Sequence, residues 1–109
     1  MKTGATLYAF TNAWHRRELT LPQLLAKVAA LGLGPGLEVI GYQTFRGFPH
    51  VSDDDAARFK DLVAEHGFTP SCLSINADMA IRRGTMMSIE EAVAYHVPQI
   101  EAAAKLGFP

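Results

Sequence analysis

One carboxylate lies inside an apolar run, which makes it the first candidate for a residue with a chemical role. Glu38 stands between Leu37 and Val39 in residues 31–41, which read L-G-L-G-P-G-L-E-V-I-G. A carboxylate in an apolar strand costs free energy unless it is paired, is solvated at the strand end or has a function. Glu38 is therefore a candidate binding residue, and a structural carboxylate held by arginines or backbone donors is the competing interpretation.

Three further candidates follow the predicted strands 5–10 and 37–41. Trp14 and His15 come after the first strand, and His50 comes after the second. An indole can stack on a ligand ring, and an imidazole can hydrogen-bond to it or act as a base because histidine titrates near neutral pH. Each of these three side chains could instead pack on a loop or be an exposed loop residue without a binding role.

Polar residues also follow the third predicted strand, 71–76. Asn76 and Asp78 could contact hydroxyl groups of a ligand, although Asn and Asp side chains also build turns. Arg82 and Arg83 could bind a phosphate bidentately, and an ordinary solvated pair is the competing interpretation.

Several kinds of site are disfavoured by the sequence. Residues 53–55 are three aspartates at a predicted helix start, where they complement the helix dipole; a metal site there is the weaker alternative. Cys72 has no obvious activating partner, so a buried, inert thiol is expected. Zinc-type Cys/His spacing, a P-loop and a dinucleotide-binding glycine pattern are all lacking.

The elements that must position these residues repeat along the chain. Gly32, Gly67 and Gly107 each suit the position just past a helix end, and they are 35 and 40 residues apart. Between them the apolar periodicity predicts strands over 5–10, 37–41 and 71–76, and helices over 20–31, 52–66 and 88–106. Alternating strands and helices indicate an α/β fold with a parallel sheet covered by helices.

Composition places the chain among ordinary globular proteins. It has 109 residues, one cysteine and a formal net charge of −1. A near-neutral chain is not typical of a nucleic-acid binder, and no apolar run approaches the roughly 18 residues of a membrane span. A single cysteine cannot form an internal disulfide, so the cytoplasm is the expected location.

Three strand–helix units can belong to a small doubly wound sheet or to a (β/α)₈ barrel. A barrel of eight such units needs roughly 250 residues. A three-stranded parallel sheet with open edges is a poor independent domain. The chain is therefore predicted to be part of a larger domain, or to associate with copies of itself through its sheet edges.

Three segments resemble the xylose-isomerase-like TIM barrels, a group that includes sugar phosphate isomerases and epimerases. They are residues 7–12 (L-Y-A-F-T-N), 36–41 (G-L-E-V-I-G) and 103–109 (A-A-K-L-G-F-P). The resemblance implies that residues 1–109 form one partial TIM-barrel domain, truncated before the fourth strand. It also implies a divalent metal, manganese or magnesium, held by ligands on later strands, so that this chain would not fully coordinate it.

The resemblance implies a function as well. The chain is expected to be the N-terminal fragment of a metal-dependent sugar or sugar phosphate isomerase or epimerase, inactive alone, whose complete form transfers a proton next to a sugar carbonyl. The early strands would contribute substrate-side residues, with Glu38 orienting a sugar hydroxyl and Trp14 stacking on the ring. A non-enzymatic, self-associating partial barrel is the alternative.

Overall fold

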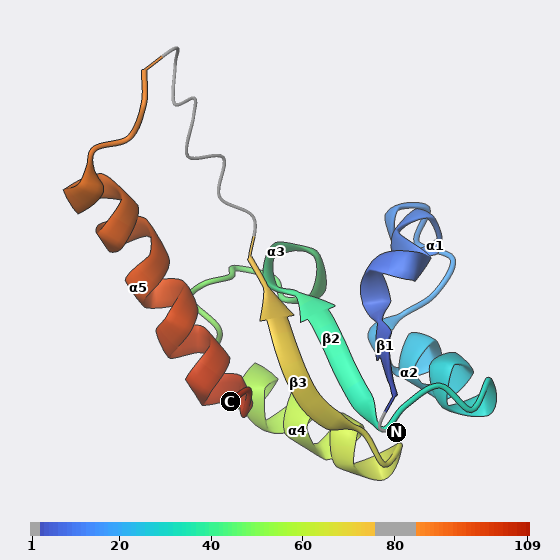
Figure 1. Cartoon of the computed structure of the whole chain (residues 1–109). Coiled ribbons are helices and arrows are strands. Elements are labelled where there is room, and N and C mark those ends of the chain that lie inside the picture. Colours follow the sequence, from blue (N-terminus) through green and yellow to red (C-terminus); the bar gives the residue numbers. More distant parts are fainter. Residues whose placement is uncertain (1–2, 76–84) are drawn as a thin grey trace.

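The computed structural model describes residues 3–75 and 85–109 of the chain (Figure 1). The elements in chain order are β1 (Gly4–Thr6), the 3₁₀ helix η1 (Leu7–Phe10), α1 (Thr11–His15), α2 (Leu21–Ala30), β2 (Gly36–Ile40), α3 (Gly41–Thr44), α4 (Asp53–Glu65), β3 (Thr69–Ser74) and α5 (Ile89–Leu106). In the described residues β1, β2 and β3 form one parallel sheet in that order. The predicted α/β fold with a parallel sheet is therefore confirmed, whereas three strands do not establish a barrel.

The long helices begin where the sequence predicts, because side chains bind the free N–H groups of their first turns. The Ser52 hydroxyl accepts a hydrogen bond from the Asp55 N–H over 3.1 Å at the start of α4. At α5, Ser88 accepts from the Glu91 N–H over 3.2 Å, and Glu91 accepts from the Ser88 N–H over 2.9 Å. These contacts satisfy donors that a helix start otherwise leaves without a partner.

The same helices end in one repeated geometry. Gly32, Gly67 and Gly107 have φ angles of 68°, 70° and 88°, a region that favours glycine. After each glycine, the N–H of the next residue donates to the carbonyl five residues earlier, over 3.4, 2.9 and 3.0 Å. After the first two glycines the chain enters β2 and β3. This geometry is a Schellman-type helix ending.

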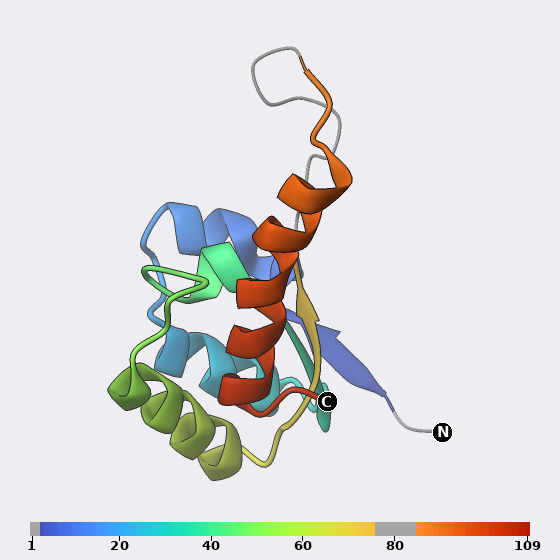
Figure 2. The ribbon, with the colours of Figure 1, turned by 90° about the vertical axis from the view of Figure 1, so that its left-hand side faces the viewer.

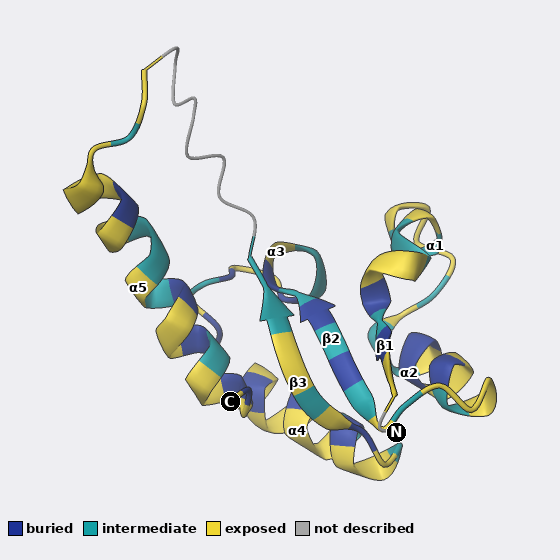
Figure 3. Cartoon of the chain, in the orientation of Figure 1, coloured by how far each residue is buried: buried dark blue, intermediate teal, exposed yellow. Residues whose placement is uncertain are grey.

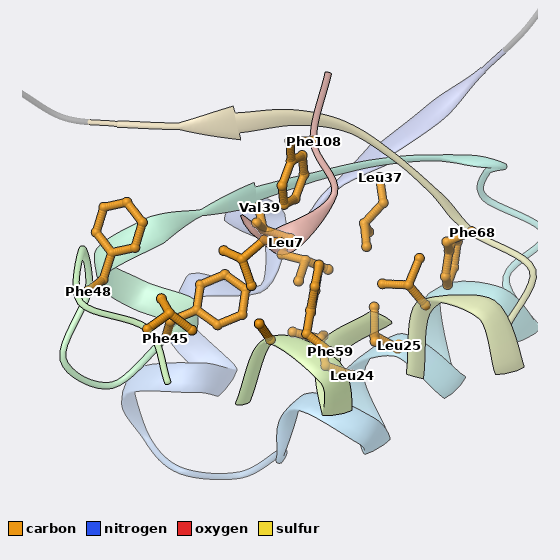
Figure 4. Packing of buried hydrophobic residues seen from close by; sticks show 14 of the residues in the cluster. Leu7, Leu24, Leu25, Leu37, Val39, Phe45, Phe48, Phe59, Phe68 and Phe108 are labelled. Carbon is orange, nitrogen blue, oxygen red and sulfur yellow. The ribbon is translucent and has the colours of Figure 1, made fainter. Parts of the chain in front are cut away.

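The core lies between the sheet and the helices on one of its faces. Leu37 and Val39 of β2 are fully buried and point toward Leu25 of α2 and Phe59 of α4 (Figure 4). The rings of Phe59 and Phe108 stack at 5.9 Å, and Phe45 meets Phe59 edge-on at 5.0 Å. In Figure 3 the buried residues accordingly alternate along β2. Among the described residues, no helix has the length and apolar character needed to cross a membrane.

The first strand is shorter than predicted. Residues 5–10 were expected to be extended, but β1 ends at Thr6 and residues 7–10 form η1. The Thr6 hydroxyl accepts from the Tyr8 N–H over 3.3 Å, and the Thr11 hydroxyl donates to the Tyr8 carbonyl over 2.6 Å. These side chains stabilise a turn in a run that apolar periodicity alone cannot distinguish from a strand. The predicted loop after it contains the short helix α1.

The third strand starts earlier than the predicted residue 71 and is irregular. Its pairing with β2 shifts register between Leu37 and Glu38, so that Leu37 lies opposite Pro70 and Glu38 opposite Cys72. Proline has no N–H for the sheet, and the Ser71 hydroxyl donates to the Leu37 carbonyl over 2.9 Å. The bulge thus keeps this carbonyl hydrogen-bonded and sets which β3 side chains share a face with Glu38.

Candidate functional site

One face of the sheet carries no helix among the described residues. Thr6, Glu38 and Cys72 lie side by side in the strand register, and Ile40 lies opposite Ser74. Side chains alternate between the two faces of a strand, so these residues point away from the buried face that carries Leu37 and Val39. Seen from the side, the helices lie on one side of the strands (Figure 2).

Glu38 has a polar neighbour on this face. The Ser74 hydroxyl donates to Glu38 Oε1 over 2.5 Å, and the Cys72 sulfur lies 3.8 Å from the Ser74 oxygen. Glu38 and Ser74 are half-buried, and Cys72 is exposed, contrary to the buried thiol predicted. Within the described residues, Glu38 Oε2 has no hydrogen-bond partner. The arrangement fixes one carboxylate oxygen and leaves the other able to accept a hydrogen bond from a ligand hydroxyl. We call Glu38, Cys72 and Ser74 the sheet-face cluster.

The segments that follow β1 and β2 are tied together at the carboxyl end of the sheet. The Gln43 amide on α3 donates to the Thr11 hydroxyl on α1 over 3.2 Å. Figure 1 shows η1, α1 and α3 at the ends of the strand arrows. In parallel α/β proteins this end of the sheet is where ligands bind.

Trp14 and His15 lie together beside that end. Both line an open hollow of about 520 Å³ with Arg17, Leu19 and Thr20. Trp14 is half-buried and packs on the hydrophobic core, while His15 is exposed. The indole therefore has a structural role already, and the imidazole is free to meet a ligand.

The remaining candidates are not gathered around Glu38. His50 is exposed and lines a separate hollow of about 390 Å³ with Pro98 and Lys105, between the loop after α3 and helix α5. Asn76, Asp78, Arg82 and Arg83 lie outside the described residues.

The described residues do not form a metal site by themselves. In residues 3–75 and 85–109, no three His, Cys, Asp or Glu side chains converge. The aspartates at the start of α4 make other contacts: Asp53 pairs with Lys105 over 2.7 Å, and the hydrogen bond from this lysine lowers the pKa of Asp53. Asp55 accepts a hydrogen bond from the Ser52 hydroxyl over 2.8 Å. We therefore derive no chemical step through a metal.

A tyrosine pair links α3 to α5 and gives a pH-dependent signal. Tyr42 on α3 and Tyr95 on α5 form this pair. The hydrogen bond between them, and to a smaller extent burial, raises the pKa of Tyr42 from 10.0 to about 12. Folding thus favours the neutral phenol of Tyr42. The contribution of this hydrogen bond to folding stability is complete below about pH 10 and is lost as the pH rises through about 12.

We expect an absorbance titration at high pH to show a tyrosine ionisation step near pH 12 that Tyr42→Phe removes. Tyr8→Phe, at an exposed tyrosine, serves as the control and should retain the step; its loss there would contradict the assignment.

Sequence reasoning missed Ser74 and Gln43. Ser74 could have been found from alternation, because Cys72 and Ser74 are two residues apart on one strand. Their position beside Glu38 depends on the bulge at Ser71, which the sequence did not indicate. Gln43 lies between the predicted strand 37–41 and the predicted helix 52–66, a segment in which only His50 was a candidate.

The chain is similar to alpha subunits of bacterial deglycosidases. It is 50% identical over 106 residues to a C-glycoside deglycosidase alpha subunit of Microbacterium trichothecenolyticum and 51% identical over 107 residues to one of Arthrobacter globiformis. It is 37% identical over 108 residues to a 3'-dehydrocarminate deglycosidase alpha subunit of a Microbacterium species. These matches cover 97–99% of the chain but 29–31% of the relatives' length. No protein-family model matches the chain.

These relatives correct the functional expectation. Assignment to the xylose-isomerase-like group, and with it the sugar isomerase or epimerase function, is wrong, because the matched proteins are named as deglycosidase subunits. The alternative of a non-enzymatic module is overturned by the same finding. The error arose because the three resembling segments are strand and helix-end patterns, which position a site without specifying its chemistry. The chain spans about three-tenths of the length of the curated relatives that it matches.

Proposed function

We propose that this chain forms part of the alpha subunit of a deglycosidase that acts on C-glycosides. The observation that carries this proposal is the identity of 50–51% with two C-glycoside deglycosidase alpha subunits over 97% of the chain. Identity at that level along nearly every residue supports a shared fold and a shared place in the larger subunit.

Within that subunit, the described sheet would be the first part of a closed (β/α)₈ barrel, with residues 1–109 as one structural unit. Two features support the barrel. The strands are parallel and follow one another in sequence order, and in the part of the chain that the structure describes the helices pack on one face of the sheet. Closure would place the sheet-face cluster inside the barrel, at the end where barrel enzymes bind their substrates.

The sugar part of the substrate would then meet Glu38 and His15. The free Glu38 oxygen would accept a hydrogen bond from a sugar hydroxyl while Ser74 holds the other oxygen. Asn76 and Asp78 remain candidates on sequence grounds, and His50 is the weakest because it lines a separate hollow. A divalent metal, manganese or magnesium, stays part of the proposal for a complete subunit, with ligands beyond the described residues. A cytoplasmic location is likewise proposed.

The proposal is tested by a chimeric subunit. The matched 106 residues of the Microbacterium trichothecenolyticum alpha subunit are replaced by this chain, and the chimera is produced together with the other subunits of that enzyme. We expect release of the aglycone from a C-glycoside within about tenfold of the natural enzyme, since conserved packing should preserve the site to within about 1.4 kcal/mol of transition-state stabilisation.

The matched control is the same relative with those 106 residues deleted, which should release no aglycone. A chimera that is folded by circular dichroism and assembled with its partner subunits, yet leaves the C-glycoside intact, would refute the proposed function.

A further inference from the structure

A groove with a buried acceptor lies beside the edge of β3 that pairs with no other described strand. Its volume is about 230 Å³, and apolar side chains dominate its lining. They come from β3 or the residue after it (Leu73, Ile75), from α5 (Ile100, Ala103) and from the chain after α5 (Phe108). Gln99 lines the same groove. The groove therefore opens on the flank of β3 that faces away from β2.

Gln99 is the polar residue of this groove. Its side chain is fully buried, and its amide nitrogen donates to the Tyr95 carbonyl over 2.9 Å. Its Oε1 atom is buried and has no hydrogen-bond partner among the described residues. An unsatisfied buried acceptor costs free energy, so it is expected to have a partner in the complete protein.

A second apolar surface borders the groove along α5. Ile89, Val93, Val97 and Ile100 recur at helical spacing and are 79%, 55%, 44% and 62% exposed. We call these four residues the α5 stripe. A contiguous exposed apolar surface of this kind usually marks an interface.

The helix endings indicate what covers both surfaces. Gly107 and Phe108 end α5 with the same φ sign and the same backbone hydrogen bond as the glycines that precede β2 and β3. Each earlier ending leads the chain into a strand added at the same side of the sheet, and α4 packs against both α2 and α5. The relatives are more than three times as long as the matched segment, so they contain residues that could supply another such unit.

We propose that the groove is the docking site of a fourth parallel strand, supplied by the polypeptide that follows Pro109 in a complete subunit. A backbone N–H or side-chain donor of that incoming unit binds Gln99 Oε1, and its helix covers the α5 stripe. The inference rests on the proposed function only in taking the chain as part of a longer subunit. Gln99 Oε1 would then be without a hydrogen-bond partner in the described residues of the short chain and hydrogen-bonded in a complete subunit.

The first test uses Gln99→Met, which keeps the length of the side chain and removes both polar atoms. In the 109-residue chain the change removes the unpaired acceptor and also the amide hydrogen bond to the Tyr95 carbonyl. Because an unsatisfied buried acceptor costs more than one hydrogen bond contributes, we expect the Tm to rise by about 2 °C or more. In the chimeric subunit the same change removes a satisfied hydrogen bond, so we expect the Tm to fall by about 2 °C or more. The same sign in both proteins would overturn the role of Gln99.

The second test is made within the chimera alone and does not require the short chain to fold. Ile100→Cys and Glu101→Cys are compared by thiol labelling followed by mass spectrometry of the α5 peptide. Glu101 is exposed and belongs to another face of α5, so it is the control. We expect the cysteine at position 100 to react about tenfold more slowly, because the incoming unit buries it. Equal rates would refute docking in the groove.

Two outcomes distinguish the docking site from the proposed function and from self-association. A chimera that protects position 100 but leaves a C-glycoside intact would refute the function and leave the docking site standing. If instead the chimera forms oligomers in sedimentation, and position 100 becomes protected only as the chimera concentration rises, the occupant is a second copy and the assignment to a fourth strand is overturned.

Discussion

Replacing Phe59 by alanine is expected to destabilise the chain by about 3–5 kcal/mol, the largest single-residue effect on stability that we predict. Phe59 is 1% exposed and sits where α4 meets the sheet. Its ring packs edge-on against Phe45 at 5.0 Å and stacks on Phe108 at 5.9 Å. Removing it leaves a cavity that joins the loop after α3, helix α4 and the chain after α5, so the surrounding groups cannot close it by moving one side chain.

Urea unfolding followed by far-ultraviolet circular dichroism measures this loss. Because small domains are stable by only about 5–15 kcal/mol, the variant should be partly unfolded without urea if the parent lies at the low end. Tyr8→Ala removes an aromatic ring that is 63% exposed and is the control, with an expected change within about 0.5 kcal/mol. A similar small change for Phe59→Ala would mean that the three rings do not form the centre of the core.

The helix boundaries were predictable because local chemistry determines them. Ser52 and Ser88 are the first residues of the predicted helices 52–66 and 88–106, and both hydroxyls accept backbone hydrogen bonds there, as serine favours at a helix start. Gly67 and Gly107 were chosen as helix ends because only glycine adopts a positive φ without cost, and both do so. No contact distant in sequence is needed for any of these features.

The strand details depended on contacts that no local pattern contains. β1 ends at Thr6 because Thr6 and Thr11 hydrogen-bond to the backbone of Tyr8, whereas the apolar character of residues 5–10 is equally compatible with a strand. The bulge at Ser71 likewise appears only when β3 lies beside β2. Since that bulge brings Ser74 to Glu38, the sequence identified the carboxylate but not the hydroxyl that holds it.

The chemistry of the complete protein was the least predictable level. A glycine-rich helix ending followed by an apolar strand with one glutamate positions a carboxylate on a sheet face, and many reactions can use such a carboxylate. The isomerase expectation came from this scaffold pattern and was wrong, whereas identity along the whole chain pointed to deglycosidase subunits. The position of a carboxylate in the fold therefore indicates where a ligand can bind, but it does not determine which reaction follows.

Glu38→Gln is expected to have the largest effect on activity among the described residues. In the chimeric subunit we expect the rate of aglycone release, as kcat/KM, to fall by about 100-fold, because a hydrogen bond from a sugar hydroxyl to a charged carboxylate contributes about 1.5–3 kcal/mol. Glutamine has the same shape and can still accept the Ser74 hydrogen bond, which spans 2.5 Å in the parent. The change therefore removes charge while leaving the packing of the sheet intact.

Two further variants show whether the loss of activity comes from the charge of Glu38 itself. Ser74→Ala frees the held carboxylate oxygen without removing charge, so we expect a smaller fall of about tenfold, near the lower end of the roughly 1.5–3 kcal/mol that a hydrogen bond to a charged group contributes. Asp54→Asn removes an exposed carboxylate from the start of α4, away from the sheet-face cluster, and should leave kcat/KM unchanged. Thermal unfolding of all three must stay close to that of the chimera. If Glu38→Gln then retains activity within about twofold, the carboxylate is structural, and the substrate-facing role of this sheet face is wrong.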